Sequence, residues 1–197
     1  MRKLGITIVS LLVLAACGGG EEASSSETTT TTVAVADSTA TTEWADMVGG
    51  VLDNLIAAQR ESTNAFVAVF EPGPAEVTAI RDLFQSDAAS LADAVAALPP
   101  PPDDPALAVP YDAFVTALGA ESDTASDIAT ELTSDHDALR AEVEANGGDS
   151  DGTRYGQLRG LFGPVVGART DACFSVQAAF ESAGLESINC IDDEPLG

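Results

Sequence analysis

The chain has 197 residues, of which 32 are acidic and 8 are basic, so its formal net charge is −24. Such a surface repels the phosphates of nucleic acids and of anionic lipid headgroups, and we therefore expect no nucleic-acid partner. Two of the basic residues, Arg2 and Lys3, precede an apolar run from Leu4 to Val13. A short basic start followed by an apolar run of this length is the pattern of a secretory signal.

The apolar run ends in Leu14-Ala15-Ala16-Cys17, which resembles the lipobox of bacterial lipoproteins. The resemblance implies that residues 1–16 are removed as a signal peptide and that the thiol of Cys17 is lipidated. An apolar run of about 13 residues is too short to cross a hydrocarbon core roughly 30 Å thick, which agrees with its removal. We therefore expect a protein anchored in the cell membrane through Cys17, on the extracytoplasmic face.

Residues 17–42 are rich in Gly, Ser and Thr and poor in large apolar side chains, so they cannot bury a core. We expect this segment to be a disordered tether with a root-mean-square reach of roughly 25 to 30 Å. It would hold a folded domain, residues 43–197, clear of the bilayer.

Apolar residues in the folded domain recur at steps of three and four, the period of an amphipathic helix, and period-two alternation is nowhere sustained. Proline and glycine clusters divide this pattern into four helices, predicted at about residues 43–70, 74–98, 110–146 and 153–183. Pro74 and Pro110 suit first helical positions, and Gly184 suits a C-terminal cap. The pattern predicts an all-α fold, an antiparallel up-down-up-down four-helix bundle.

The segment from Thr153 to Thr170 contains no acidic residue in an otherwise acidic chain. It carries three arginines and a stripe of four glycines, namely Arg154, Arg159, Arg169, Gly156, Gly160, Gly163 and Gly167. Each glycine costs a helix about 1 kcal/mol relative to alanine, so the stripe requires an explanation. Three remain open: close packing against another helix, a ligand or partner face on which the arginines hold an anion, and a helix broken at Pro164.

Arg169 falls at an apolar position of the fourth predicted helix, where a buried guanidinium requires a carboxylate. If the third and fourth predicted helices are antiparallel across a turn at residues 147–152, the candidate partners are Asp127, Glu131 and Asp135. Such a pair would be structural and would fix the register of two helices. The alternative is that Arg169 binds the carboxylate or phosphate of a ligand inside the bundle.

Cys173 and Cys190 are the two cysteines besides Cys17. The signal directs both to an oxidising compartment, where a disulfide is expected. The helix from Cys173 to Gly184 is about 16 Å long, and the six extended residues that follow it can span roughly 20 Å. Cys190 can therefore reach Cys173. We expect the disulfide to pin the C-terminal tail against the bundle.

No catalytic or metal-binding pattern in the sequence meets its own requirements. Residues 148–152 match the G-x-S-x-G pattern, but the nucleophile elbow needs a preceding strand and a later histidine, and the only histidine is His136. The same stretch lacks the first and twelfth ligands of an EF-hand, and one histidine cannot supply a di-iron centre. We expect His136 to be solvated on a helix surface, and we expect no enzyme activity, no cofactor and no metal.

These observations lead to two hypotheses on function. The first is a non-catalytic binding or interaction module of the cell envelope, whose partner is an envelope protein or polymer. The second is a solute-binding lipoprotein that holds a small molecule between helices near the glycine stripe and Arg169, in an internal cavity.

Overall fold

The computed structural model of the chain describes residues 38–190, and this part is all-helical, with no strand. Its helices are α1 (Ser38–Val69), α2 (Glu76–Ala97), α3 (Pro105–Ser134), α4 (His136–Ala145), α5 (Arg154–Gly160) and α6 (Phe162–Ala183). The expected all-α class is confirmed. The predicted signal peptide, the predicted lipidation site Cys17 and most of the predicted tether lie outside the described residues.

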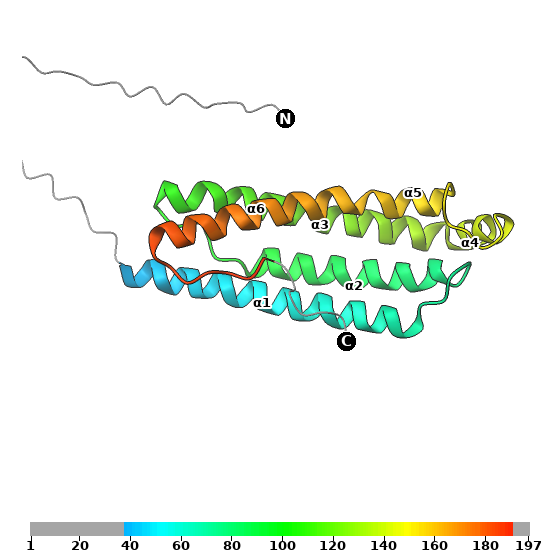
Figure 1. The fold of residues 1–197 in the computed structure, drawn as a ribbon, viewed down its shortest axis with the longest axis horizontal. Coiled ribbons are helices and arrows are strands. Elements are labelled where there is room, and N and C mark those ends of the chain that lie inside the picture. The colour runs from blue at the N-terminus through cyan, green and yellow to red at the C-terminus, as the bar shows by residue number, and fades with distance from the viewer. Residues whose placement is uncertain (1–37, 191–197) are drawn as a thin grey trace, which may run out of the picture. The chain divides into compact units, whose positions relative to one another are not determined.

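Four long helices, α1, α2, α3 and α6, lie side by side, and α4 and α5 lie at one end of them (Figure 1). α1 packs on α2, α2 packs on α3, and α3 packs on α6. The buried apolar side chains between them recur at helical spacing, as with Phe114, Leu118, Ala125 and Leu132 of α3. Within residues 38–190, no helix is both long and apolar enough to cross a membrane.

The chain that follows α6 lies between α6 and α1, which do not pack extensively on each other in the described part of the chain (Figure 1). Ile188 of this segment is buried and packs beside Gly49 of α1. Trp44 of α1 and Phe180 of α6 meet at one end, with ring centroids 5.4 Å apart. We call the space between α1 and α6 the α1–α6 seam. Beyond Leu55, α1 has no buried residue, so the other half of the seam is more open.

Two of the observed helices, α1 and α3, begin earlier than predicted. α1 begins at Ser38, so the last residues of the predicted tether are helical. α3 begins at Pro105, after Asp104 caps it by accepting a hydrogen bond from the Ala106 amide at 2.9 Å, and Pro110 lies inside the helix.

The third and fourth predicted helices are each divided in two. The first division comes after Ser134, at Asp135, whose φ of −109° and ψ of 18° depart from helical values, and α4 follows. The second comes at Leu161, between α5 and α6. Pro164 is the third residue of α6, a position whose missing N–H leaves no helical hydrogen bond unmade.

Candidate functional site

One polar residue from each of the four long helices lies in a common layer of the molecule. This polar layer consists of Ser62 of α1, Asp87 of α2, Glu121 of α3 and Arg169 of α6. The Nε atom of Arg169 donates to Oε2 of Glu121 at 2.8 Å. The hydroxyl of Ser62, which also lies 2.6 Å from Ser86 Oγ, interacts with the carboxyl group of Asp87, and the charge of Glu121 acts on the same group. The four side chains therefore form one connected polar layer in an otherwise apolar interior.

Helical spacing places the two acids of the layer inward. Asp87 follows the buried Phe84 by three residues and precedes the buried Leu91 by four. Glu121 stands in the same relation to the buried Leu118 and to Ala125 of α3. Neither acid was predicted from the sequence. The sequence does contain a signal for both, since each acid interrupts an apolar series at a core position.

Each of these carboxylates has one oxygen atom with no hydrogen-bond partner among residues 38–190, namely Asp87 Oδ1 and Glu121 Oε1. Both residues are buried, with exposed fractions of 9% for Asp87 and 1% for Glu121. A buried acceptor left unsatisfied costs about 1–3 kcal/mol, and more when it is charged. The layer therefore reduces the stability of the fold as long as these two atoms stay unpaired.

The pKa of Asp87 is raised from 3.8 to about 6. Burial is the larger cause, and the neighbouring charge of Glu121 adds to it, while the hydrogen bond from Ser62 opposes both. At neutral pH the layer thus holds two carboxylates against the single guanidinium of Arg169.

The carboxylate partner of Arg169 is Glu121, and the expectation of Asp127, Glu131 or Asp135 is wrong. The side chains of Arg169 and Glu121 are 13% and 1% exposed, so the pair is largely buried. Attraction in such a pair repays the cost of desolvation only with good hydrogen bonds, and removing one partner strands the other charge.

The register between α3 and α6 explains this error. The expectation placed the turn at residues 147–152, as if one helix continued to residue 146. Instead, α3 ends at Ser134 and α5 starts at Arg154, while α4 forms a separate element in the connection. The antiparallel pairing of α3 with the chain from α5 to α6 is centred roughly midway between these two ends. Arg169 therefore lies about two and a half turns nearer the start of α3 than expected.

Cys173 and Cys190 lie beside the polar layer. Their Sγ atoms are 2.13 Å apart and their Cα atoms 5.6 Å apart, which is disulfide distance. Both residues are buried. The Nη1 atom of Arg169 donates to the carbonyl oxygen of Cys190 at 3.3 Å, so the segment after α6 is tied to the layer through a second contact.

The other two arginines of the predicted anion site already have carboxylate partners. Arg154 pairs with both Glu131 and Asp135, and Arg159 pairs with the buried Glu76. These contacts lie where α5 meets the ends of α2 and α3, whereas Arg169 lies in the middle of α6. The three arginines therefore do not form one site, and each is neutralised by the protein's own acids.

The glycine stripe is not covered by a neighbouring helix. Gly160, Gly163 and Gly167 are exposed, and a Cβ atom built on any of them would meet nothing within 4 Å. Gly156 differs, because a Cβ atom there would collide with the carbonyl oxygen of Ser150. Close helix packing is therefore the wrong explanation for three of the four glycines. The helix is interrupted within the stripe, but at Leu161, where α5 ends and α6 begins, and not at Pro164. This break does not explain Gly167, which lies in the interior of α6.

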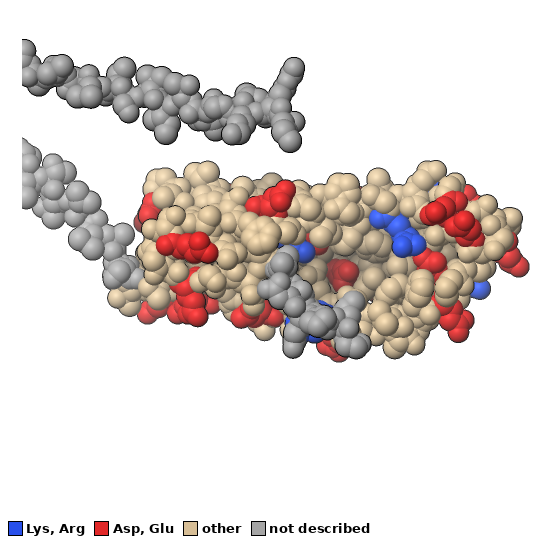
Figure 2. All heavy atoms as spheres, viewed as in Figure 1, with Lys and Arg blue, Asp and Glu red and all other residues tan. Residues whose placement is uncertain are grey.

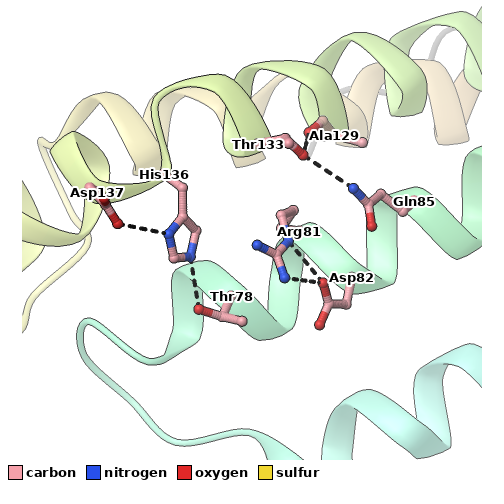
Figure 3. A network of polar contacts seen from close by, with 8 residues as sticks. All are labelled: Thr78, Arg81, Asp82, Gln85, Ala129, Thr133, His136 and Asp137. Atoms are coloured by element: carbon pink, nitrogen blue, oxygen red, sulfur yellow. Dashed lines mark hydrogen bonds and ion pairs between the residues drawn. The ribbon is translucent and has the colours of Figure 1, made fainter.

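A second polar cluster joins α4 to α2 (Figure 3). His136 Nε2 lies 2.9 Å from Thr78 Oγ1, and His136 Nδ1 lies 3.3 Å from Asp137 Oδ1. This order of hydroxyl, imidazole and carboxylate is that of a hydrolase triad, but the carboxylate of Asp137 is fully exposed and cannot orient the ring as a buried one does. We interpret the cluster as a link between helices. The expectation of a solvated His136 is wrong, because its side chain is only 19% exposed.

The polar layer lies level with the more open half of the α1–α6 seam, because Ser62 follows Leu55 on α1. Figure 2 shows a hollow on this face, between α1 and α6, with acidic atoms on its floor. The inward faces of α2 and α3 form that floor, because these helices pack on each other opposite the seam. Asp87 of α2 and Glu121 of α3 are buried residues of these two helices.

No protein-family model matches the chain, and no curated protein or solved structure is significantly similar to it. Within residues 38–190, no group of three or more His, Cys, Asp or Glu side chains is arranged to hold a metal ion.

Proposed function

We propose that the protein is a lipid-anchored, extracytoplasmic binding protein that holds a small solute at the polar layer. Its domain is an up-down-up-down four-helix bundle, and a disulfide between Cys173 and Cys190 pins the segment after α6 in the α1–α6 seam. The lipid on Cys17 keeps the domain at the membrane. The observation that carries the proposal is the pair of unpartnered carboxylate oxygens in the layer.

The bundle is supported by the order of helix contacts. Each long helix packs on the next long helix in the chain, as expected of antiparallel neighbours in an up-down-up-down bundle. The disulfide is supported by the 2.13 Å between the two sulfur atoms and by the oxidising compartment that the signal implies.

The proposed site is supported by the stability that the polar layer costs the fold. A core of packed apolar side chains is usually at least as stable as one that contains an ion pair, and unsatisfied acceptors add a further penalty. Features that lower stability and have no structural role are concentrated at functional sites. A ligand that supplies hydrogen-bond donors to Asp87 and Glu121 would remove the penalty.

A second candidate function is docking of an envelope protein or polymer. It is favoured by apolar side chains at the end of α1 and just beyond it, where Val67, Val69 and Phe70 are exposed. Exposed apolar groups that cluster in this way are typical of interaction surfaces.

The anchor is tested by substituting the modified cysteine. The wild-type chain is expected in the membrane fraction of its host, with an N-terminal peptide that carries the mass of acyl chains. The Cys17→Ser variant is expected outside the membrane fraction. Wild-type protein that leaves the membrane at high salt without detergent would contradict the anchor, because salt releases only electrostatic attachment.

The binding function is tested by native mass spectrometry of protein purified from its host's envelope, before and after unfolding. A reproducible extra mass that is lost on unfolding is expected. The mass should be absent from an Asp87→Asn variant and present in Asp82→Asn, whose carboxylate also lies on α2 but is exposed beside Arg81. An extra mass that persists in Asp87→Asn would place the ligand elsewhere.

A further inference from the structure

The charges of the polar layer do not balance when Asp87 is ionised. Glu121 is paired with Arg169. The described groups that act on Asp87 are the hydroxyl of Ser62 and the carboxylate of Glu121, and neither is positive. A buried negative charge of this kind either takes up a proton or pairs with a cation.

The unused acceptors of the layer come from two helices. Asp87 Oδ1 of α2 and Glu121 Oε1 of α3 have no partner among residues 38–190, whereas the Ser62 hydroxyl on α1 already lies 2.6 Å from Ser86 Oγ. An ammonium group has three N–H donors and one positive charge. It can therefore donate to both oxygen atoms and supply the missing charge.

We propose that the polar layer binds the ammonium group of a small organic amine between Asp87 and Glu121, with the carbon chain of the amine in the α1–α6 seam. This inference rests on the proposed function and names the class of its ligand. The seam offers apolar contacts next to the layer: Phe84, one turn before Asp87 on α2, packs edge-on against Phe162 of α6, with ring centroids 4.9 Å apart. Aromatic rings near an ammonium group also attract it through their negative faces.

An anionic ligand does not fit this layer. The Nε and Nη1 atoms of Arg169 already donate to Glu121 and to the carbonyl of Cys190. Two carboxylates would repel the anion at the same place. The layer thus favours a cationic ligand, whereas Arg169 considered alone led to the expectation of an anionic one.

A divalent metal ion does not fit either. Calcium takes six to eight oxygen ligands, and magnesium requires an octahedral set. The layer supplies two carboxylates and one hydroxyl, and the described part of the chain has no group of three or more metal-ligating acids, histidines or cysteines. A monovalent organic cation needs only the acceptors that are present.

A proton competes with the amine. Burial, with the charge of Glu121, raises the pKa of Asp87 to about 6. The groups that face Asp87 are Ser62 on α1 and Glu121 on α3, with Arg169 on α6 behind Glu121. Below that pKa Asp87 is neutral, and the site has no net negative charge to attract an ammonium group. Binding is therefore expected at about pH 8 and lost at about pH 5.

The test measures thermal unfolding of the full mature chain with Cys17 replaced by Ser, in n-butylammonium chloride and in potassium chloride of equal concentration. At about pH 8, butylammonium at a hundred times its Kd is expected to raise the Tm by more than about 3 °C over potassium. The increase should disappear at about pH 5 and in Asp87→Asn and Glu121→Gln. It should remain in Asp82→Asn, which removes an exposed charge from the same helix.

Two results would overturn the inference: no difference between butylammonium and potassium at about pH 8 at any concentration, or an equal increase in Asp87→Asn. Native mass spectrometry separates this failure from that of the proposed function. A bound mass that proves to be a neutral or acidic molecule would overturn the amine and leave a binding protein. A ligand-free mass together with no amine effect would overturn both.

Discussion

At the scale of single residues, Asp87 is the side chain with the strongest conflict between its position and its charge. It lies at a core position of α2, and its Oδ1 atom has no partner among the described residues. Its folded-state pKa of about 6 exceeds the ordinary value of 3.8, so the folded protein binds more protons than the unfolded chain between these pH values. Stability from this group is fully present below about pH 4 and is lost as the pH rises to about 6.

The substitution Asp87→Asn is therefore expected to stabilise the ligand-free protein at pH 7 but not at pH 4. The gain at pH 7 should approach about 3 kcal/mol, since each unit of pKa shift corresponds to about 1.36 kcal/mol. Urea unfolding followed by the fluorescence of Trp44, the single tryptophan, measures the free energy of unfolding at each pH. Asp82→Asn is the control and should show no such pH-dependent gain. A constant difference between Asp87→Asn and wild type across this range would contradict the account.

The substitution Arg169→Met is expected to destabilise the fold by about 3–5 kcal/mol at pH 7, because it leaves Glu121 as a buried and unpaired charge. The double variant Arg169→Met with Glu121→Leu should recover most of this loss, since both charges are then gone. Chemical unfolding of the two variants supplies the comparison. A double variant no more stable than Arg169→Met would show that the ion pair itself carries the stability.

At the scale of elements, the glycine stripe separates two roles of glycine in one stretch of helix. Gly167 lies in the interior of α6 with open space around its Cα atom, whereas the backbone beside Gly156 is in contact with the loop at Ser150. The periodicity of the sequence could not distinguish these roles, because both glycines fall on the same helical stripe. Only the break at Leu161 and the position of the loop decide which glycine is required.

We expect Gly167→Ala to stabilise the protein by about 0.5–1 kcal/mol, the usual gain in helix propensity. Gly156→Ala should instead destabilise it, because the added methyl group collides with the Ser150 carbonyl. Midpoints of thermal unfolding measured in parallel test the pair of variants. Equal effects of the same sign would refute the assignment of the two roles.

The segment after α6 is the second element whose role can be tested. The proposed disulfide closes a loop over a sequence separation of 17, for which the chain-entropy treatment gives about 3 kcal/mol. A Cys173→Ser, Cys190→Ser double variant is expected to lose about that amount. Amide hydrogen exchange should also become faster in α1 around Gly49, which packs beside Ile188. Reduced wild-type protein is the matched control, and unchanged exchange around Gly49 would argue that the segment stays in the seam without the bond.

At the scale of the whole molecule, the sequence predicted the fold class better than it predicted the site. Helical periodicity and proline or glycine clusters located the long helices, and the core position of Arg169 correctly required a carboxylate. The register between α3 and α6 could not be predicted from the sequence. It depends on the break between α3 and α4, which local sequence patterns do not encode. Asp87 and Glu121 were missed because an acid within an apolar series resembles a solvated residue until the surrounding helices are in place.

The most direct test of the central claim is the pKa of Asp87, measured by NMR of carboxyl carbons in the ligand-free mature chain with Cys17 replaced by Ser. The Asp87→Asn variant assigns the signal. We expect a pKa of about 6 and a fall in that pKa when butylammonium is added, because a bound cation favours the ionised carboxylate. A value near the ordinary 3.8, unmoved by the amine, would mean that the charge of Asp87 is already compensated. The polar layer would then be a structural element of the bundle.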